Sequence, residues 1–169
     1  MAFYATPSPS HPPYFPDMSP RDIGEFGLHV VGSGESVGEI VLLKTLTMIL
    51  SEWGVPVSKI RVNALGDKDS QQRFLREISL FVRKHAARLE EAKRSAILEN
   101  PLLLYRDGSD VHKEIASEGP RPMHFLSEKS RVHFRSILEH LENLGLPYEL
   151  DDSLVGDERG QHVTFAIDH

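Results

Sequence analysis

The chain has 169 residues, 40% of them hydrophobic, and a formal net charge of −6, so it can bury one hydrophobic core and is predicted to be a single domain. The acidic balance excludes a protein that coats nucleic acid through bulk positive charge and leaves only a local basic patch for such a contact. The absence of cysteine excludes disulfides, thiolate metal sites and a cysteine nucleophile.

The first 22 residues contain more than half of the prolines, together with three serines. Proline fixes φ and lacks a backbone N–H, so this composition disfavours both a helix and a central strand. Residues 1–22 are therefore expected to form a loop or tail. Their aromatic residues leave open whether the segment is disordered or is anchored on a folded surface.

Two strands and one helix are expected between residues 25 and 65. An apolar run over residues 25–31 is typical of a strand, and residues 59–65 alternate polar and apolar side chains like a half-buried strand. Between them, residues 37–53 are apolar on more than one face, which predicts a buried helix that ends at Gly54. The glycines of residues 32–38 do not match the spacing of a dinucleotide-binding loop, so a plain turn is favoured over a phosphate site.

Helices are expected to dominate the middle of the chain. Apolar residues at helical spacing predict a long helix to about residue 88, capped by Asp69 or Ser70, then a short helix over residues 90–98 and another long helix between Ser127 and Gly145. The glycine- and proline-containing stretch between the last two helices should be loop with short helical turns. Two further strands are expected near the C-terminus, over residues 147–150 and 161–167, and this order of elements indicates an α/β or α+β fold.

One charge feature stands out in this helical part. Between residues 73 and 94, basic residues outnumber acidic ones by seven to three. On a helix, Arg76, Arg83, Lys84 and Arg88 would form a stripe suited to phosphate oxygens. An ordinary solvated helix face is the alternative explanation.

No metal site is predicted, although the chain contains nine histidines. None of them forms a close pair of the H-E-x-x-H kind, and the acidic residues between 151 and 158 lie in a turn where solvated carboxylates are expected. The N-terminus lacks the layout of a signal peptide, and the longest apolar stretch is interrupted by Lys44. We therefore expect a soluble, cytoplasmic protein without a membrane or DNA partner.

Four segments, in the same order and spacing, resemble histidyl-tRNA synthetases. They are residues 62–67 (VNALGD), residues 89–102 with LEE followed by ENPL, residues 120–134 (PRPMHFLSEKSRVHF) and residues 144–150 (LGLPYEL). The similarity extends over most of residues 24–167. It implies an α+β fold with an incomplete class II synthetase-like antiparallel sheet, in which residues 23–66 and 147–169 belong to the catalytic core and residues 67–146 form a helical insertion.

In that family the complete protein activates histidine with ATP and Mg and transfers it to tRNA, and the insertion is credited with gripping the tRNA acceptor arm. The resemblance thus implies tRNA and a second copy of the chain as partners, and it gives the basic stripe a plausible ligand. Motif 1, motif 3 and the anticodon-binding domain of the family have no counterpart in these residues.

The positions that carry the family's chemistry hold other residue types here. Glu25 and His29 match the glutamine and glutamate that bind the histidine substrate, and Gly156 matches the arginine that stabilises charge as the adenylate forms. An imidazole cannot hold an ammonium group as a carboxylate does, and glycine has no side-chain donors to replace those of arginine. The resemblance therefore supports no catalytic residue in this chain and leaves two functions open: part of a synthetase, or a non-catalytic paralogue that binds tRNA or protein.

Overall fold

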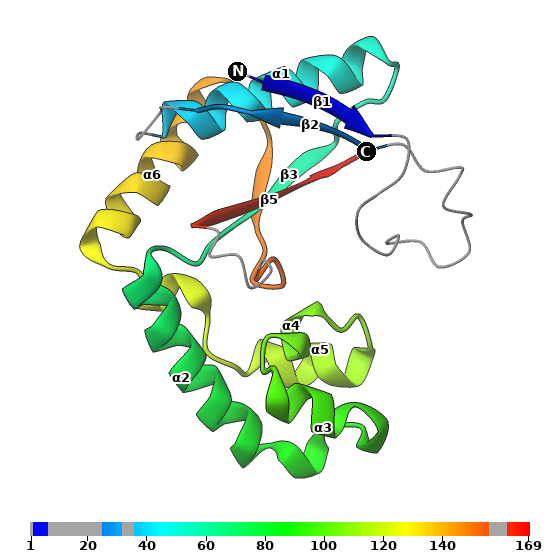
Figure 1. Ribbon diagram of the computed structural model, residues 1–169, viewed down its shortest axis with the longest axis vertical. Coiled ribbons are helices and arrows are strands. Elements are labelled where there is room, and N and C mark those ends of the chain that lie inside the picture. Colours follow the sequence, from blue (N-terminus) through cyan, green and yellow to red (C-terminus); the bar gives the residue numbers. More distant parts are fainter. Residues whose placement is uncertain (1, 7–24, 32–35, 156–161) are drawn as a thin grey trace. The chain divides into compact units, whose positions relative to one another are not determined.

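The computed structural model describes residues 2–6, 25–31, 36–155 and 162–169 (Figure 1). The chain divides into two compact units, Met1–Ile49 and Leu50–His169. Within the described residues, every helix is too short or too polar to span a lipid bilayer.

The first unit contains a pair of antiparallel strands, β1 (Ala2–Thr6) and β2 (Glu25–His29), followed by most of helix α1 (Val37–Glu52). The strand predicted at residues 25–31 and the helix predicted at residues 37–53 are confirmed. A strand at Ala2–Thr6 was not expected, because the whole N-terminal segment was predicted to be loop or tail. The prolines begin only at Pro7, and the aromatic residues before it favour a strand. Residues 7–24 lie outside the described part of the chain.

The second unit is built on a three-stranded sheet. Its central strand β3 (Lys59–Ala64) pairs with β5 (Val163–Asp168) in antiparallel and with β4 (Tyr148–Leu150) in parallel orientation. The predicted α+β class is confirmed, and the sheet is mixed rather than wholly antiparallel. The parallel pair follows from the connection, because the chain leaves β3, passes through the helices and returns to the same end of the sheet before β4, as a crossover requires.

Helices fill the segment between β3 and β4. They are α2 (Lys68–Lys84), the 3-10 turn η1 (Ala86–Arg88), α3 (Glu91–Glu99), α4 (Leu103–Arg106), α5 (Asp110–Ser117), the 3-10 turn η2 (Pro122–Phe125) and α6 (Glu128–Asn143). The predicted short helix and both long helices are confirmed. Helix α2 begins earlier than predicted, because the cap is Asp67 rather than Asp69 or Ser70. The stretch expected to be loop with short helical turns contains two short helices, α4 and α5.

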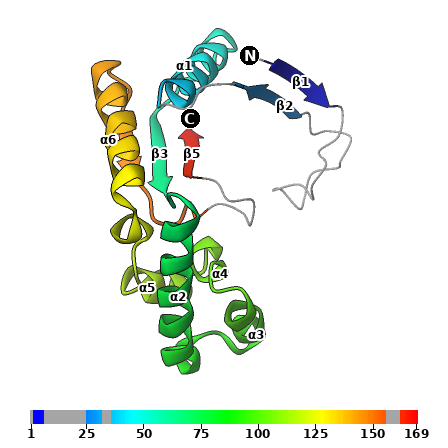
Figure 2. The ribbon, with the colours of Figure 1, turned by 60° about the vertical axis from the view of Figure 1, so that its left-hand side comes forward.

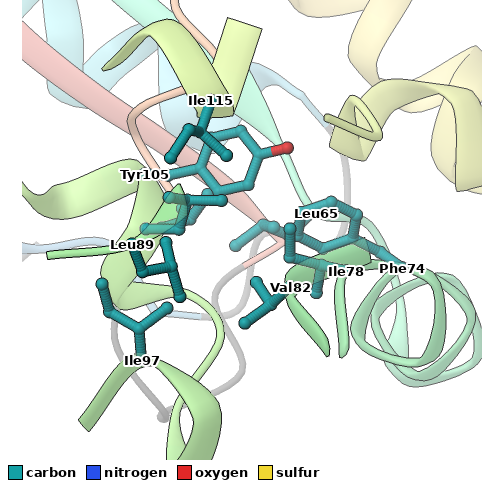
Figure 3. Packing of buried hydrophobic residues seen from close by; sticks show 10 residues of the cluster. Leu65, Phe74, Ile78, Val82, Leu89, Ile97, Tyr105 and Ile115 are labelled. Carbon is teal, nitrogen blue, oxygen red and sulfur yellow. The ribbon is translucent and has the colours of Figure 1, made fainter. Parts of the chain in front are cut away.

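Two apolar clusters hold this unit together. In the first, Val62 and Ala64 of β3 pack with Phe134 of α6 and with Leu126, so α6 covers one face of the sheet. The second cluster joins α2 to the small helices α3, α4 and α5 (Figure 3). It also includes Val155 from the chain after β4. Phe74, Ile78 and Val82 place one side of α2 in this second cluster, so the opposite side faces solvent.

A buried histidine links three of these helical segments. The side chain of His112 is fully buried; its Nδ1 lies 2.5 Å from Asp107 Oδ2, and its Nε2 accepts a hydrogen bond from the backbone N–H of Glu90 at 3.4 Å. Because Nε2 accepts, we assign the ring proton to Nδ1, which donates it to Asp107. Both ring nitrogens are thus used within the fold. No group of three or more His, Cys, Asp or Glu residues suited to a metal ion occurs among the described residues.

Asp107 makes stability depend on pH in the acid range. The Lys93 ammonium, 2.8 Å away, and then the His112 N–H lower the pKa of this mostly buried carboxyl to about 2. A lowered pKa stabilises the fold above pH ~4, the value of an unfolded aspartate, and that stability is lost as the pH falls toward about 2. Asp107→Asn should remove about 2 kcal/mol of the pH dependence of the unfolding free energy in this window.

Urea titrations of both proteins between about pH 1.5 and about pH 5 measure this effect, because this range brackets the folded and the unfolded pKa of Asp107. The matched control is Asp110→Asn, because the Asp110 side chain is fully exposed. Parallel pH profiles for Asp107→Asn and the unsubstituted chain would show that the Asp107 contacts do not stabilise the fold.

Candidate nucleic-acid interface

The solvent-facing side of α2 carries three of the four predicted tRNA-binding residues. Arg76 and Arg83 are seven residues apart, which is nearly two helical turns, so they lie almost in line and about 10 Å apart along the axis. Lys84 lies beside Arg83 on the same exposed half of the helix. All three are exposed. We call Arg76, Arg83 and Lys84 the cation face.

The charges of the cation face are not neutralised within the fold. In the part of the chain that the structure describes, none of its three side chains has a carboxylate or other hydrogen-bonding partner. Arg73, on the same half of α2, is 3.3 Å from Asp69 in an exposed ion pair, which contributes little binding energy and breaks easily. Helix α2 therefore presents unpaired positive charge in a chain whose net charge is −6.

Arg88, the fourth predicted residue, lies elsewhere. It belongs to η1, after the end of α2, and its Nη1 and Nη2 donate to the two carboxylate oxygens of Glu118 at 2.7 and 2.8 Å. A guanidinium that is bidentate to a carboxylate has fewer donors left for a phosphate. The structure thus places Arg76, Arg83 and Lys84 on one exposed side of α2, whereas Arg88 follows that helix and is bound by Glu118.

The positions matched to the family's histidine pocket lie in the first unit. Glu25 and His29 are the first and last residues of β2, opposite Thr6 and Ala2 of β1 in the strand register. Gly156 lies outside the described residues. The side chains of Glu25 and His29 also lie outside the described part of the structure.

Sequence reasoning missed an ionic cluster on the sheet face that α6 does not cover. Arg61 Nη1 donates to Asp151 Oδ2 at 2.7 Å, and Arg61 Nε donates to Asp168 at 3.0 Å. One side chain of β3 thereby ties together the strand β5 and the residues after β4. In the sequence, the alternation of polar and apolar residues over residues 59–65 predicts that this strand has a polar face. It does not predict which residues pair with Arg61.

This cluster does not fit the phosphates of ATP. Two carboxylates, Asp151 and Asp168, already bind the Arg61 guanidinium. A triphosphate there would compete with two fixed negative charges that lie closer to the guanidinium. We therefore assign no ATP-binding role to Arg61.

Comparison with known proteins finds similarity to histidine–tRNA ligases. The chain is 30% identical over 135 residues to a histidine–tRNA ligase of Rubrobacter xylanophilus, which covers 80% of this chain and 32% of that protein. It is 26% identical over 148 residues to a histidine–tRNA ligase of Rippkaea orientalis, which covers 87% of this chain and 34% of that protein. The chain is a partial homologue of the histidine–tRNA ligases. It spans about a third of the length of the curated relatives it matches, and no family model matches it.

The fold agrees with this histidine–tRNA ligase homology. A crystal structure of apo histidyl-tRNA synthetase from S. aureus superposes with a TM-score of 0.61 at 22% identity, covering 87% of this chain and 35% of that one. At this identity the match concerns the fold alone. It confirms the α+β class, whereas the limits of the insertion at residues 67–146 stay a prediction.

Proposed function

We propose that this chain is the tRNA-holding part of a histidyl-tRNA synthetase-like catalytic region and that the cation face of α2 makes the contact. The observation that carries the proposal is the presence of three exposed, unpaired cations on one side of α2. Phosphate oxygens are the partners that such cations favour, and an RNA duplex presents them at regular spacing. The relatives' name supports tRNA as the RNA in question.

The chain by itself is not proposed to activate histidine. The residue types at Glu25 and His29 differ from those of the family's histidine pocket, and Arg61 is bound by carboxylates. Oxyanion chemistry needs positive groups already positioned at the reacting phosphate. We therefore propose three further properties only for a synthetase-like protein that contains such a region. They are histidine activation with ATP and Mg, assembly as a homodimer and a cytoplasmic location.

Two assays on the purified chain test this function. Fluorescence anisotropy with labelled tRNA should show binding that weakens with salt, with a log–log slope of about −2 to −3 for three phosphate contacts. ATP–pyrophosphate exchange in the presence of histidine should stay at background. The absence of tRNA binding at low salt would refute the RNA-holding role, and measurable exchange would refute the claim that the chain alone is inactive.

A further inference from the structure

The N-termini of α2 and α6 meet at one carboxylate. Asp67 Oδ1 accepts hydrogen bonds from the backbone N–H of Ser70 at 2.9 Å and from Ser70 Oγ at 2.7 Å, which caps α2. Its other oxygen, Oδ2, accepts from Ser127 Oγ at 2.5 Å. Ser127 is the N-cap of α6. A single side chain therefore serves the first turns of two helices.

Further bonds close this network in both directions. The backbone N–H of Ser127 donates to Ser70 Oγ at 2.8 Å, and the backbone N–H of Asp67 donates to Ser130 Oγ at 3.0 Å. Ser70 and Ser130 are buried, so water competes little for these bonds. We call Asp67, Ser70, Ser127 and Ser130 the clip.

The clip lies where the two apolar clusters of the unit meet. Helix α6 packs on the sheet through Phe134, whereas α2 packs on the small helices through Phe74 and Ile78. Figure 2 shows α6 alongside the sheet and α2 running away from it, so the two helices diverge from the clip. The direction of α2 relative to the sheet therefore depends on the contacts between the two clusters, and the clip supplies hydrogen bonds at that place.

A small change in the direction of α2 at the clip produces a large displacement of the cation face. Arg83 is 16 positions beyond Asp67, a distance of about 24 Å along the helix axis. A tilt of about 10° at the clip would move that end of α2 by about 4 Å, which is more than the tolerance of a phosphate hydrogen bond. From this geometry we infer that Asp67 is a positioning residue, which fixes the direction of α2 and its cation face relative to the sheet.

Substitutions can separate capping from bridging. Serine is as good an N-cap as aspartate, so Asp67→Ser keeps the cap of α2, but its single oxygen cannot also reach Ser127. Asparagine is the conservative replacement, because its Oδ1 can cap α2 while its Nδ2 donates to Ser127 Oγ. Ser127→Gly removes the bridge from the other side at little cost to the α6 cap.

Spin-label distances test the positioning role directly. The natural chain has no cysteine, so the double variant Leu80→Cys, Glu139→Cys places one label on exposed sites of α2 and of α6. Asp67→Ser and Ser127→Gly should each broaden the distance distribution about twofold or shift its mean, while helix content is kept. Asp67→Asn should restore a distribution close to that of the natural residue.

The matched control is Asp69→Ser, which removes an acidic side chain from the same turn of α2 without touching the clip. The Asp69 side chain is 74% exposed. Unchanged distributions in both clip variants would overturn the inference, and so would equal broadening in Asp69→Ser.

A second test, which rests on the proposed function, measures the tRNA affinity of Asp67→Ser. The positioning role and a pure charge effect predict opposite changes in this affinity. Removing one negative charge beside the cation face should tighten tRNA binding, as expected for Asp69→Ser. If Asp67 positions α2, Asp67→Ser instead weakens tRNA binding about threefold or more, because a pre-set contact geometry is lost. Tighter binding by Asp67→Ser would overturn the role of Asp67 in RNA binding. A chain that binds no tRNA would refute the proposed function, while the distance measurement would still decide the positioning role.

Discussion

Replacing both Arg76 and Arg83 by glutamate is expected to weaken tRNA binding roughly 30- to 100-fold at low salt and to flatten its salt dependence by about two units of slope. Each arginine neutralises a phosphate in the proposed complex, and each glutamate adds repulsion. Because both side chains are exposed and have no partner in the described structure, the substitutions should leave folding intact. Anisotropy titrations between about 50 and 200 mM salt measure both quantities.

Two further variants show whether the loss comes from the cation face. Lys113→Glu reverses the charge of an exposed lysine on α5, which lies 3.9 Å from Asp110, and should weaken binding by no more than about threefold in total. Glu118→Gln releases the bidentate partner of Arg88 and should tighten binding, since a further guanidinium becomes available. The losses of tRNA affinity are compared as logarithms. If Lys113→Glu loses half as much affinity as the double variant, or more, the interface is not localised on α2.

Gly66→Ala is expected to destabilise the second unit by about 3 kcal/mol. The φ angle of Gly66 is 73°, in the left-handed region that costs a residue with a Cβ about 1 kcal/mol or more. A Cβ at this position would also lie 2.7 Å from Leu126 Cδ2 and 2.9 Å from Ser70 Cβ. Both contacts are beside the clip, so relief of the clash would disturb the junction between α2 and α6. Urea unfolding followed by circular dichroism measures the loss.

Gly145→Ala isolates the backbone part of this effect. Its φ angle is 63°, and an added Cβ would meet no atom within 4 Å. The expected loss is therefore only about 1 kcal/mol. Equal losses at the two glycines would show that the close approach of Leu126 and Ser70 to Gly66 contributes nothing.

Local patterns in the sequence predicted the long helices but not how they are joined. The apolar spacing of Phe74 and Ile78 was enough to place α2, and Gly145 was enough to end α6. The cap of α2 was placed two or three residues late, at Asp69 or Ser70, and the bond to Asp67 from Ser127, 60 residues away in the sequence, was not predicted. Hydrogen bonds between distant residues leave no periodic signal.

The same reason separates the predicted from the unpredicted parts of the candidate site. Helical spacing could bring Arg76 and Arg83 to one face, because that relation is local. It could not show that Glu118, 30 residues beyond Arg88, binds this arginine. Nor could it pair Arg61 with Asp151 and Asp168, which are 90 and 107 residues away.

The most direct test of an RNA-holding α2 is to map the tRNA contact on the chain itself. With 169 residues, the protein is small enough for residue-by-residue NMR spectra recorded during a titration with tRNA. We expect the salt-sensitive shift changes to concentrate on the exposed positions of Lys68–Lys84 and to be largest near Arg76, Arg83 and Lys84. Shift changes centred on another element, with α2 unaffected at saturating tRNA, would contradict the account.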